Sequence, residues 1–371
     1  MKATKKKICF IIPTFNPGGT ENYLLRFLKF SDSKFNVTII CKNSIGCDGS
    51  LLHQYKELPI SIICQPLSYF NLKNFKKIYV ILKNGQFDTV CDLTGNFGGL
   101  PMLFSRMLKI KNRISFYRRS SYAFKQTKLN LFYNSIVNRL VYHNATKIFS
   151  NSTYALDFFF PHKKKDDKRF KVIPNGVNQY DFTIEGDTEE LRNSLKIKND
   201  IFLIGHIGRY DSAKNHETIL KVAEKLIKTD DSIEFLFCGM DTNDDELKNK
   251  IQKYNLTDKV HTLGVRNDVP SILKLFDIFY FPSITEGQPN ALIEAMISNI
   301  PIVTSNIEPI KEVMPIDKYN LLVAPNDIDN AVVSILNIKK DSKIRKKHQF
   351  RDWAIKSFNF ETNFKKFEIE L

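Results

Sequence analysis

The stretch IFLIGHIGRYDSAKNHETILKVAEKLIKT, residues 201–229, contains in one piece the pattern that decides the fold. An apolar run at 201–206 has the length of a buried strand, and a polar loop follows it. The helix after the loop has apolar residues at helical spacing and Glu–Lys pairs four residues apart on its other side. The apolar face is formed by Ile219, Val222, Ala223, Leu226 and Ile227, and the pairs are Glu217–Lys221 and Glu224–Lys228.

The same alternation of short apolar runs and amphipathic stretches continues in both directions. Short buried strands separated by helices predict parallel sheets that are covered on both faces. At 371 residues the chain suits two domains of about 180 residues each. We therefore expect an α/β protein with two Rossmann-like, doubly wound domains. The expected strands are 8–12, 37–41, 60–64, 87–91, 113–116 and 147–150 in the first half, and 201–206, 233–237, 260–263, 278–281, 302–304 and 321–323 in the second.

The expected boundary lies where PNGVNQYDF, residues 174–182, interrupts the pattern with Pro174 and Gly176. We predict domains at 1–178 and 179–350, facing each other across a cleft, and an amphipathic C-terminal stretch at 351–371. Ligands of open parallel sheets bind at the carboxyl ends of the strands, so the loops after the strands should hold the functional residues.

The six cysteines fall mostly in apolar, strand-like runs, and none forms a C-x-x-C pair. We therefore expect reduced core cysteines, with neither a disulfide framework nor a zinc site. The basic start of the chain is followed by an apolar run, 8–12, which is too short for a signal peptide. No run reaches the roughly 20 apolar residues that span a bilayer, so a cytoplasmic location is expected.

The net charge of +15 is unevenly distributed along the chain. Residues 1–178 contain 29 Lys and Arg against 9 Asp and Glu, which gives +20, whereas residues 179–371 contain 26 against 31, which gives −5. A basic half attracts nucleic acid, anionic lipid or a polyanionic substrate, and charge alone does not choose among them. A lysine-rich solvated surface with no specific partner is the alternative.

TEGQPNALIEAM, residues 285–296, places Glu286 and Glu294 eight residues apart across a loop that turns into a helix. Gly287 lets the loop backbone approach a ligand, and Pro289 suits the first helical turn, where no N–H is needed. The helix N-terminus favours a phosphate or a sugar hydroxyl. Glu294 lies deeper in the helix and suits the vicinal diol of a ribose. Two solvated glutamates on a surface helix are the alternative.

In HIGRYDSAKNH, residues 206–216, Arg209 and Lys214 lie on a loop before a helix. Two fixed cations there would neutralise a diphosphate and stabilise the charge of a leaving group, although they could also be ordinary surface residues.

In PTFNPGGTEN, residues 13–22, Gly18 and Gly19 precede a helix expected at 21–30. They allow backbone approach to a phosphate or sugar, or they form a tight turn without a ligand. The missing G-x-G-x-x-G and ribose-binding acid disfavour a nicotinamide cofactor.

Several of these segments together resemble the nucleotide-sugar half of the family 4 retaining glycosyltransferases, which have the GT-B fold. PNGVN at the domain junction and PGGTEN near the N-terminus resemble the same family, so the similarity covers nearly the whole chain. The segments are GRYDSAKNH at 208–216, VHTLGVRNDV at 260–269, FPSITEGQPNALIEAM at 281–296, SNIPIVTS at 298–305, and Glu312.

The resemblance implies a donor site for a nucleoside diphosphate sugar. Arg209 and Lys214 would bind the diphosphate, Glu294 the ribose, and Gly18 and Gly19 the phosphates or the acceptor from the opposite domain. The C-terminal stretch would return to the first domain. The loop that would hold the donor sugar comprises Glu286, Gly287, Gln288, Pro289 and Asn290, and the base would lie beside 264–267, including Gly264 and Val265. The expected catalytic residues are Arg209, Lys214 and Glu286.

The segment after the fifth strand departs from the family pattern. Many relatives have a histidine there, whereas SFYRRSSYAF has Arg118, Arg119 and Ser120. Arginine cannot act as a base near neutral pH but can bind an anionic acceptor or a phosphate. We predict that these three residues bind the acceptor, with an ordinary surface role as the alternative. His206 and His261 lie in or beside strands and are expected to be packing residues.

We therefore predict a metal-independent, retaining hexosyltransferase (EC 2.4 class) without a cofactor. It would move a hexose from a UDP-sugar to a glycan, expected to be lipid-linked, in surface polysaccharide biosynthesis. We expect it at the inner face of the cell membrane as a peripheral protein that meets anionic lipid and no nucleic acid. A sugar-nucleotide epimerase of the same fold and a basic nucleic-acid-binding protein are the alternatives. The first would need acid/base residues, and the second would need aromatic residues interleaved with basic ones.

Overall fold

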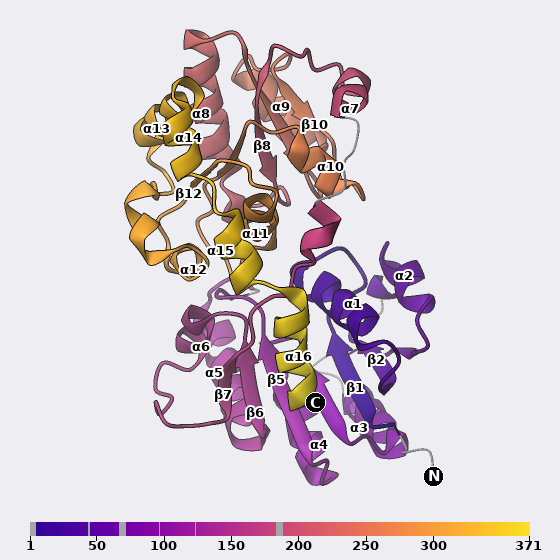
Figure 1. Ribbon diagram of the computed structural model, residues 1–371. Coiled ribbons are helices and arrows are strands. Elements are labelled where there is room, and N and C mark those ends of the chain that lie inside the picture. The colour runs from indigo at the N-terminus through magenta and orange to yellow at the C-terminus, as the bar shows by residue number, and fades with distance from the viewer. Residues whose placement is uncertain (1–4, 44, 67–71, 96, 123, 183–187) are drawn as a thin grey trace. The chain divides into compact units, whose positions relative to one another are not determined.

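The computed structural model describes the chain except for residues 1–4, 44, 67–71, 96, 123 and 183–187. It divides into two compact units, one formed by residues 1–176 and 361–371 and the other by residues 177–360 (Figure 1). Both are α/β structures built on a parallel sheet, as the alternation of strands and helices predicted. We call them unit 1 and unit 2.

The sheet of unit 1 has seven parallel strands in the order β3-β2-β1-β4-β5-β6-β7. Its central strands are almost wholly buried, which is why their sequences are continuous apolar runs. The strands are β1 (Lys7–Ile12), β2 (Asn36–Cys41), β3 (Ser61–Cys64), β4 (Thr89–Asp92), β5 (Asn112–Tyr117), β6 (Lys147–Ser150) and β7 (Phe170–Val172).

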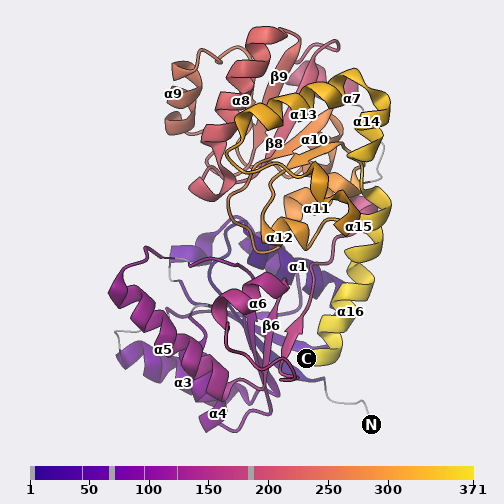
Figure 2. The ribbon, with the colours of Figure 1, turned by 90° about the vertical axis from the view of Figure 1, so that its left-hand side faces the viewer.

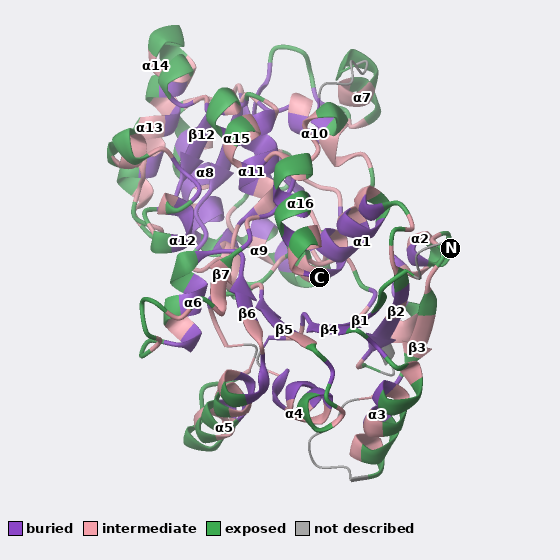
Figure 3. Ribbon diagram, turned by 60° about the horizontal axis from the view of Figure 1, so that its bottom comes forward, coloured by how far each residue is buried: buried purple, intermediate pink, exposed green. Residues whose placement is uncertain are grey.

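Helices cover both faces of this sheet (Figure 3). Helices α3, α4 and α5 lie on one face, and α1 and α16 on the other, where Phe10 of β1 and Phe116 of β5 contact Phe367 of α16. The helices of unit 1 are α1 (Gly19–Ser31), α2 (Leu52–Lys56), α3 (Leu72–Gly85), α4 (Gly99–Met107), α5 (Lys128–Asn144), α6 (Thr153–Phe159) and α16 (Phe360–Glu370), with a 3-10 turn η1 (Ile45–Asp48).

The sheet of unit 2 has five parallel strands in the order β10-β9-β8-β11-β12. Its strands are β8 (Phe202–Ile207), β9 (Ile233–Cys238), β10 (Val260–Thr262), β11 (Ile278–Phe281) and β12 (Ile302–Thr304). The helices are α7 (Thr188–Ser194), α8 (His216–Thr229), α9 (Asp245–Lys253), α10 (Val269–Lys274), α11 (Asn290–Ile297), α12 (Glu308–Lys311), α13 (Ile328–Lys340), α14 (Ser342–Lys347) and α15 (Arg351–Ser357), with 3-10 turns η2 (Gln179–Phe182), η3 (Ser212–Lys214) and η4 (Ile316–Leu321).

Two apolar clusters fill unit 2. One joins α8, α9 and α13 to the sheet, and the other joins α10, α11 and α15 to its opposite face. Helix α8 behaves as its periodicity predicts. Four of its five expected apolar residues are fully buried and Ile227 is partly buried, while Lys221 and Lys228 pair with Glu217 and Glu224 at 3.4 and 2.8 Å.

The C-terminal stretch is divided between the two units. Helix α15 packs within unit 2, where Trp353 Nε1 donates to the Val313 carbonyl oxygen at 2.9 Å. Helix α16 packs against unit 1 (Figure 2), where the Phe364 and Phe367 rings lie 5.9 and 4.8 Å from the Phe27 ring. The packing boundary therefore lies at residue 360, whereas the predicted segment began at 351.

The structure differs from the expected strands at two places: one expected strand is not formed, and one observed strand was not expected. The run 321–323 was expected to be a strand but forms the end of η4 and a single bridge between Ser305 and Val323, so that prediction was wrong. An apolar run of three residues is too short to distinguish a strand from a turn that packs on the core. Strand β7 was missed because its alternating sequence, FKV, lies beside a lysine-rich loop.

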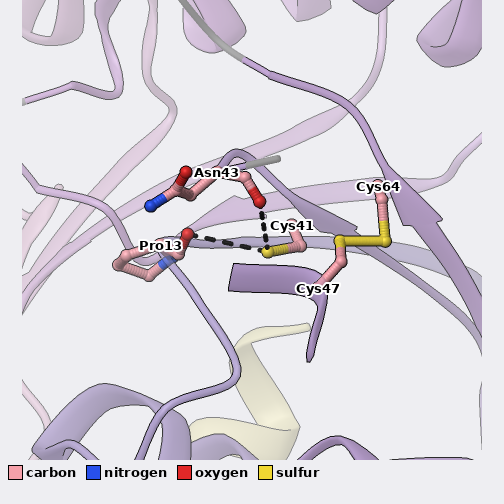
Figure 4. The surroundings of a disulfide bond; sticks show 5 residues. All are labelled: Pro13, Cys41, Asn43, Cys47 and Cys64. Atoms are coloured by element: carbon pink, nitrogen blue, oxygen red, sulfur yellow. Dashed lines mark hydrogen bonds between the residues drawn. A yellow bond between two sulfur atoms is a disulfide. The ribbon is translucent and has the colours of Figure 1, made fainter. Parts of the chain in front are cut away.

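The expectation that all six cysteines are reduced was also wrong. Cys47, in η1, and Cys64, the last residue of β3, form a disulfide bond (Figure 4). The other four cysteines are free and buried, as predicted. The two partners are 17 residues apart in a pattern that matches no disulfide framework, and only the fold of the loop after β2 brings them together. Among the described residues, no helix is both long and apolar enough to cross a bilayer.

Candidate active site

The loop after β8 carries both predicted diphosphate-binding cations. Arg209 is exposed, and Lys214 is mostly buried at the end of η3, directly before α8. The Asp211 carboxylate accepts a hydrogen bond from the Lys214 backbone N–H at 3.2 Å, which fixes this turn. The loop therefore holds its two cations at the carboxyl end of a central strand, where open parallel sheets bind ligands.

Asn215 links this loop to two others by side-chain hydrogen bonds, a role that the sequence analysis missed. Its backbone is left-handed, with φ 59°, and its side-chain amide donates to the carbonyl oxygens of Pro282 at 3.1 Å and Pro325 at 2.9 Å. A backbone hydrogen bond from Ile284 to Ala213, at 2.8 Å, joins the loops after β8 and β11 directly. The only sequence signal was an asparagine just before a helix, since asparagine tolerates this conformation better than most residues do.

Lys214 and Glu286 meet across these joined loops. The Lys214 Nζ lies 2.5 Å from Glu286 Oε1, and the two side chains are only 18% and 10% exposed. The ammonium also lies 4.9 Å from the centre of the Phe281 ring. A charge-assisted hydrogen bond with so little access to water is stronger than a surface ion pair. Two residues that the sequence assigned to the donor site are thus in direct contact.

The loop from Glu286 to the start of α11 contains the remaining predicted sugar-binding residues. Gly287, Gln288 and Asn290 are partly buried, and Pro289 is buried and caps the helix. Glu294, one turn into α11, is only 7% exposed. A buried carboxylate needs hydrogen-bond donors around it, so this glutamate is not a solvated surface residue.

The loops after β9 and β10 pack tightly against the loop after β8. A Cβ at Gly239 would lie 2.2 Å from the Gly208 carbonyl oxygen, and the positive φ of Gly264, 66°, also suits glycine. The Gly264 N–H donates to Thr242 Oγ1 at 3.1 Å. Val265, next to it, is 53% exposed. The residues predicted to border the base therefore form a rigid turn with one exposed apolar side chain.

Two histidines lie beneath the loop after β8. His206 and His216 are buried with ring centres 4.9 Å apart. Burial lowers the pKa of His206 well below its usual value and that of His216 to about 4, so both rings are neutral near pH 7. His206 Nδ1 lies 3.0 Å from the Tyr280 carbonyl oxygen. His206 is a packing residue, as predicted, and His261 lies on edge strand β10 beside Glu234 at 2.8 Å.

The predicted residues of unit 1 lie at the carboxyl ends of its strands. Gly18 caps α1 and Gly19 is its first residue. A Cβ at Gly18 would lie 2.5 Å from Glu21 Oε2, so the glycine leaves room for this buried carboxylate. Burial raises the pKa of Glu21, and hydrogen bonds from Thr14 oppose that rise. This arrangement gives Gly18 a packing role beside any role in binding.

Arg118 and Arg119 have different environments. The Arg118 guanidinium lies 3.7 Å from the centre of the Tyr23 ring and donates to Asn175 Oδ1 at 2.6 Å. Burial lowers the pKa of Arg118 to about 10. Arg119 is exposed and Ser120 is buried. Of the three predicted acceptor-binding residues, Arg119 is therefore the most exposed, and Arg118 is partly buried.

Metal ligands do not cluster in the part of the chain that the structure describes: no group of three or more His, Cys, Asp or Glu side chains is placed to hold an ion.

Comparison with known proteins identifies the class. Residues 187–356, nearly all of unit 2, match the family described as Glycosyl transferases group 1. The chain is 27% identical over 367 residues to the Escherichia coli UDP-Gal:alpha-D-GlcNAc-diphosphoundecaprenol alpha-1,3-galactosyltransferase, covering 92% of this chain and 90% of that protein. It is 24% identical over 359 residues to a Campylobacter jejuni diphospho-undecaprenol 4-alpha-N-acetylgalactosaminyltransferase, covering 93% of each.

Solved structures show the same fold. Anabaena HepE in complex with UDP and glucose superposes with a TM-score of 0.82 over 98% of both chains at 18% identity. WaaG, a glycosyltransferase involved in lipopolysaccharide biosynthesis, gives 0.76 over 97% of this chain and 98% of its own at 16% identity. The protein is a glycosyltransferase with the GT-B fold. Unit 2 matches the group 1 glycosyl transferases, and this match is consistent with the resemblance to family 4 found in the sequence.

Proposed function

We propose that this glycosyltransferase moves a hexose from a UDP-sugar to a lipid-linked glycan, with retention at the anomeric carbon. The observation that carries the proposal is the contact between Lys214 and Glu286, which lie on two loops joined by hydrogen bonds. The exposed Arg209 lies on the same loop as Lys214. These groups lie at the carboxyl edge of the unit 2 sheet, where a phosphate would meet two cations and the N-terminus of α8.

The chemistry follows from the charges. As the bond from the anomeric carbon to the diphosphate oxygen breaks, negative charge builds on the departing diphosphate. Arg209 and Lys214 would stabilise that charge, and this stabilisation is larger in the transition state than in the substrate. The acceptor hydroxyl forms the new bond on the same face and gives its proton to the departing phosphate, so no dedicated protein base is needed.

Glu286 would have two roles in this reaction. It would hold the Lys214 ammonium in place through their direct contact, and it lies on the loop assigned to the donor sugar, where a carboxylate can accept hydrogen bonds from sugar hydroxyls. Glu294 would accept hydrogen bonds from the two ribose hydroxyls. Its burial supports that role, since a ligand would meet a carboxylate already screened from water.

The relatives support the nature of the acceptor. Both curated relatives described above are named for acceptors linked to diphosphoundecaprenol. The basic charge of residues 1–178 agrees with an anionic acceptor at a membrane surface. A role in surface polysaccharide biosynthesis follows from such an acceptor.

The test combines binding and turnover. A thermal-shift panel of UDP, GDP, ADP and their hexoses should show the largest stabilisation with UDP compounds, about 2.7 kcal/mol at 100 times the dissociation constant. Transfer to a diphosphate-linked glycan should continue in EDTA, and NMR of the product should show a retained anomeric configuration. Strict dependence on a divalent metal, or preference for GDP or ADP, would contradict the proposal.

A further inference from the structure

A second charged cluster lies in unit 1, and of its residues the sequence analysis singled out only Arg119. Lys42 directly follows β2, and Asp92 is the last residue of β4. Arg119 follows β5 and is close enough for its charge to lower the pKa of Lys42. These three residues share the carboxyl edge of the sheet. Strands β1 and β4 are neighbours there although the chain runs β1-β2-β3-β4, so this is the point where the strand order reverses and open sheets bind ligands.

Lys42 is held in a defined place. Its Nζ lies 3.3 Å from the centre of the Phe97 ring, which is a close cation–π contact. Burial lowers the pKa of Lys42 to about 8, and the Asp92 carboxylate opposes that shift. A flexible surface lysine would have neither a packed ring nor a shifted pKa. The Lys42 ammonium is therefore held in one position and is partly removed from water.

Asp92 is fully buried, and its carboxylate accepts hydrogen bonds from Thr94. Thr94 donates to Asp92 Oδ1 from its backbone N–H at 3.0 Å and from its hydroxyl at 2.8 Å. A Cβ at Gly98 would lie 2.7 Å from the same oxygen, so this turn comes as close to the carboxylate as glycine allows. Burial raises the pKa of Asp92 to about 6. With 0% exposure, Asp92 acts through Lys42 and does not meet a ligand itself.

The charges of the cluster do not cancel. At pH 7 Lys42 and Arg119 carry two positive charges against one negative charge on Asp92. The groups that face Lys42 are Asp92 from β4, Arg119 from the segment after β5, and the Cys41 thiol from β2. Two cations therefore lie at the carboxyl edge of the sheet, and an anion arriving there would be stabilised by both of them.

We propose that Lys42 and Arg119 form a binding site for the diphosphate group of the acceptor, with Asp92 as the positioning residue for Lys42. This inference rests on the proposed function, since it assigns to unit 1 the anionic part of a diphosphate-linked glycan. It separates the two diphosphates of the reaction. The donor diphosphate belongs to Arg209 and Lys214 in unit 2, and the acceptor diphosphate to Lys42 and Arg119 in unit 1.

Inorganic pyrophosphate tests the site when the donor site is already filled. The full-length protein is saturated with UDP and titrated with pyrophosphate in a calorimeter. Lys42→Met, which keeps the apolar stem on Phe97, should weaken pyrophosphate binding at least tenfold, whereas Lys42→Arg should stay within about threefold. Lys56→Met changes an exposed lysine of the same unit and is the matched control. Equal pyrophosphate affinity in the Lys42→Met and control proteins overturns the site.

A pH series tests the positioning role of Asp92. In the unchanged protein, pyrophosphate affinity should fall as the pH rises through about 8, because Lys42 loses its proton. In Asp92→Asn the fall should begin at lower pH, because the carboxylate that raises the pKa of Lys42 is gone. A purely structural role of Asp92 would lower the affinity without moving the profile, and that result overturns the positioning claim.

Turnover distinguishes an acceptor diphosphate from a phospholipid headgroup. With a soluble, short-chain diphosphate-linked glycan, Lys42→Met should raise the acceptor KM at least tenfold and leave kcat within about threefold. Its partition onto phosphatidic acid vesicles should equal that of Lys56→Met. Loss of vesicle binding with an unchanged KM overturns the acceptor assignment. The UDP thermal shift is measured in parallel, so failure of the donor proposal is seen separately.

Discussion

Lys214 Nζ lies 2.5 Å from Glu286 Oε1, although the two residues are 72 positions apart in the chain. The contact exists because the loops after β8 and β11 are joined by Asn215 and by the hydrogen bond between Ile284 and Ala213. The protein's own hydrogen bonds therefore hold two charges from distant segments in one arrangement, and preorganised charges are a large contribution to enzymatic transition-state stabilisation.

Changing either member of this pair should cost both stability and turnover. Lys214→Ala or Glu286→Ala leaves one poorly hydrated charge without its partner, so we expect a loss of about 1–3 kcal/mol in the free energy of unfolding and at least a hundredfold loss in kcat. The exchange Lys214→Glu with Glu286→Lys should recover much of the stability and none of the activity. The control is Lys225→Ala, which breaks an exposed pair with Asp329. Urea titration and a transferase assay measure the two effects, and recovery of turnover by the exchanged pair would contradict the assigned roles.

Removing the carboxylate of Glu294 should weaken nucleotide binding. Each charge-assisted hydrogen bond to the ribose is worth about 1.5–3 kcal/mol, so Glu294→Ala should lower UDP affinity at least tenfold. Glu308→Ala, on the neighbouring helix α12, is the control. Calorimetry with UDP and with uracil separates the ribose and phosphate contribution from that of the base. An unchanged UDP affinity in a folded Glu294→Ala protein would remove the ribose assignment.

Acid should destabilise unit 2 through its buried histidines. His216 has a folded pKa of about 4, below its unfolded value of about 6.5, so the unfolded chain binds more protons between these two values. Stability is therefore complete above pH 6.5 and is lost as the pH falls, by about 2 kcal/mol at pH 5 from His216 alone. Within the described structure neither ring nitrogen of His216 has a hydrogen-bond partner. His216→Phe should therefore flatten the dependence and stabilise the protein at pH 5, whereas His53→Gln, at an exposed site, should not. The free energy of unfolding is measured by urea titration at several pH values. The same pH dependence in the unchanged protein, His216→Phe and His53→Gln would refute this prediction.

The basic unit should bind anionic membranes in a salt-dependent way. The phenylalanines that precede the lysines at 163–165 do not offer an apolar surface, because Phe159 and Phe160 are buried in the core of unit 1. Helix α5 instead exposes Leu129, Phe132 and Ile136 at 75%, 66% and 45% on one stripe.

Lys125, Lys128 and Arg139 are exposed beside this stripe. Flotation with anionic vesicles should be strong at low salt and largely lost near 1 M, since each basic residue near the surface contributes about 1 kcal/mol and is screened by salt. Leu129→Ser with Phe132→Ser should weaken flotation, and Val333→Ser, exposed on α13 of unit 2, should not. Equal flotation with neutral and anionic vesicles would contradict the electrostatic part of this prediction.

Most strands, and the contact of the loops that carry Lys214 and Glu286 with the same edge of a sheet, could be predicted from the sequence, because both depend on local patterns. A buried parallel strand must be a short apolar run, and a ligand loop after it needs small or charged residues. Strand β7 and the bridge at Val323 could not be predicted, since runs of three residues carry no usable period. Three other features depend on segments that meet only after folding. They are the Cys47–Cys64 disulfide, the hydrogen bonds by which Asn215 links three loops, and the packing of Arg118 on Tyr23.

The division of the C-terminal stretch between the two units sets the order in which the chain can finish folding. Phe364 and Phe367 complete an aromatic cluster on unit 1 with Tyr23, Phe27 and Phe116. On the ribosome these two rings are made after all of residues 177–360, so unit 2 has its complete sequence before unit 1 does. Domains usually fold in the order in which they are synthesised, N-terminal first. Here the apolar face that α16 covers stays open until α16 has been made, so unit 1 can complete its folding only after unit 2 has its whole sequence.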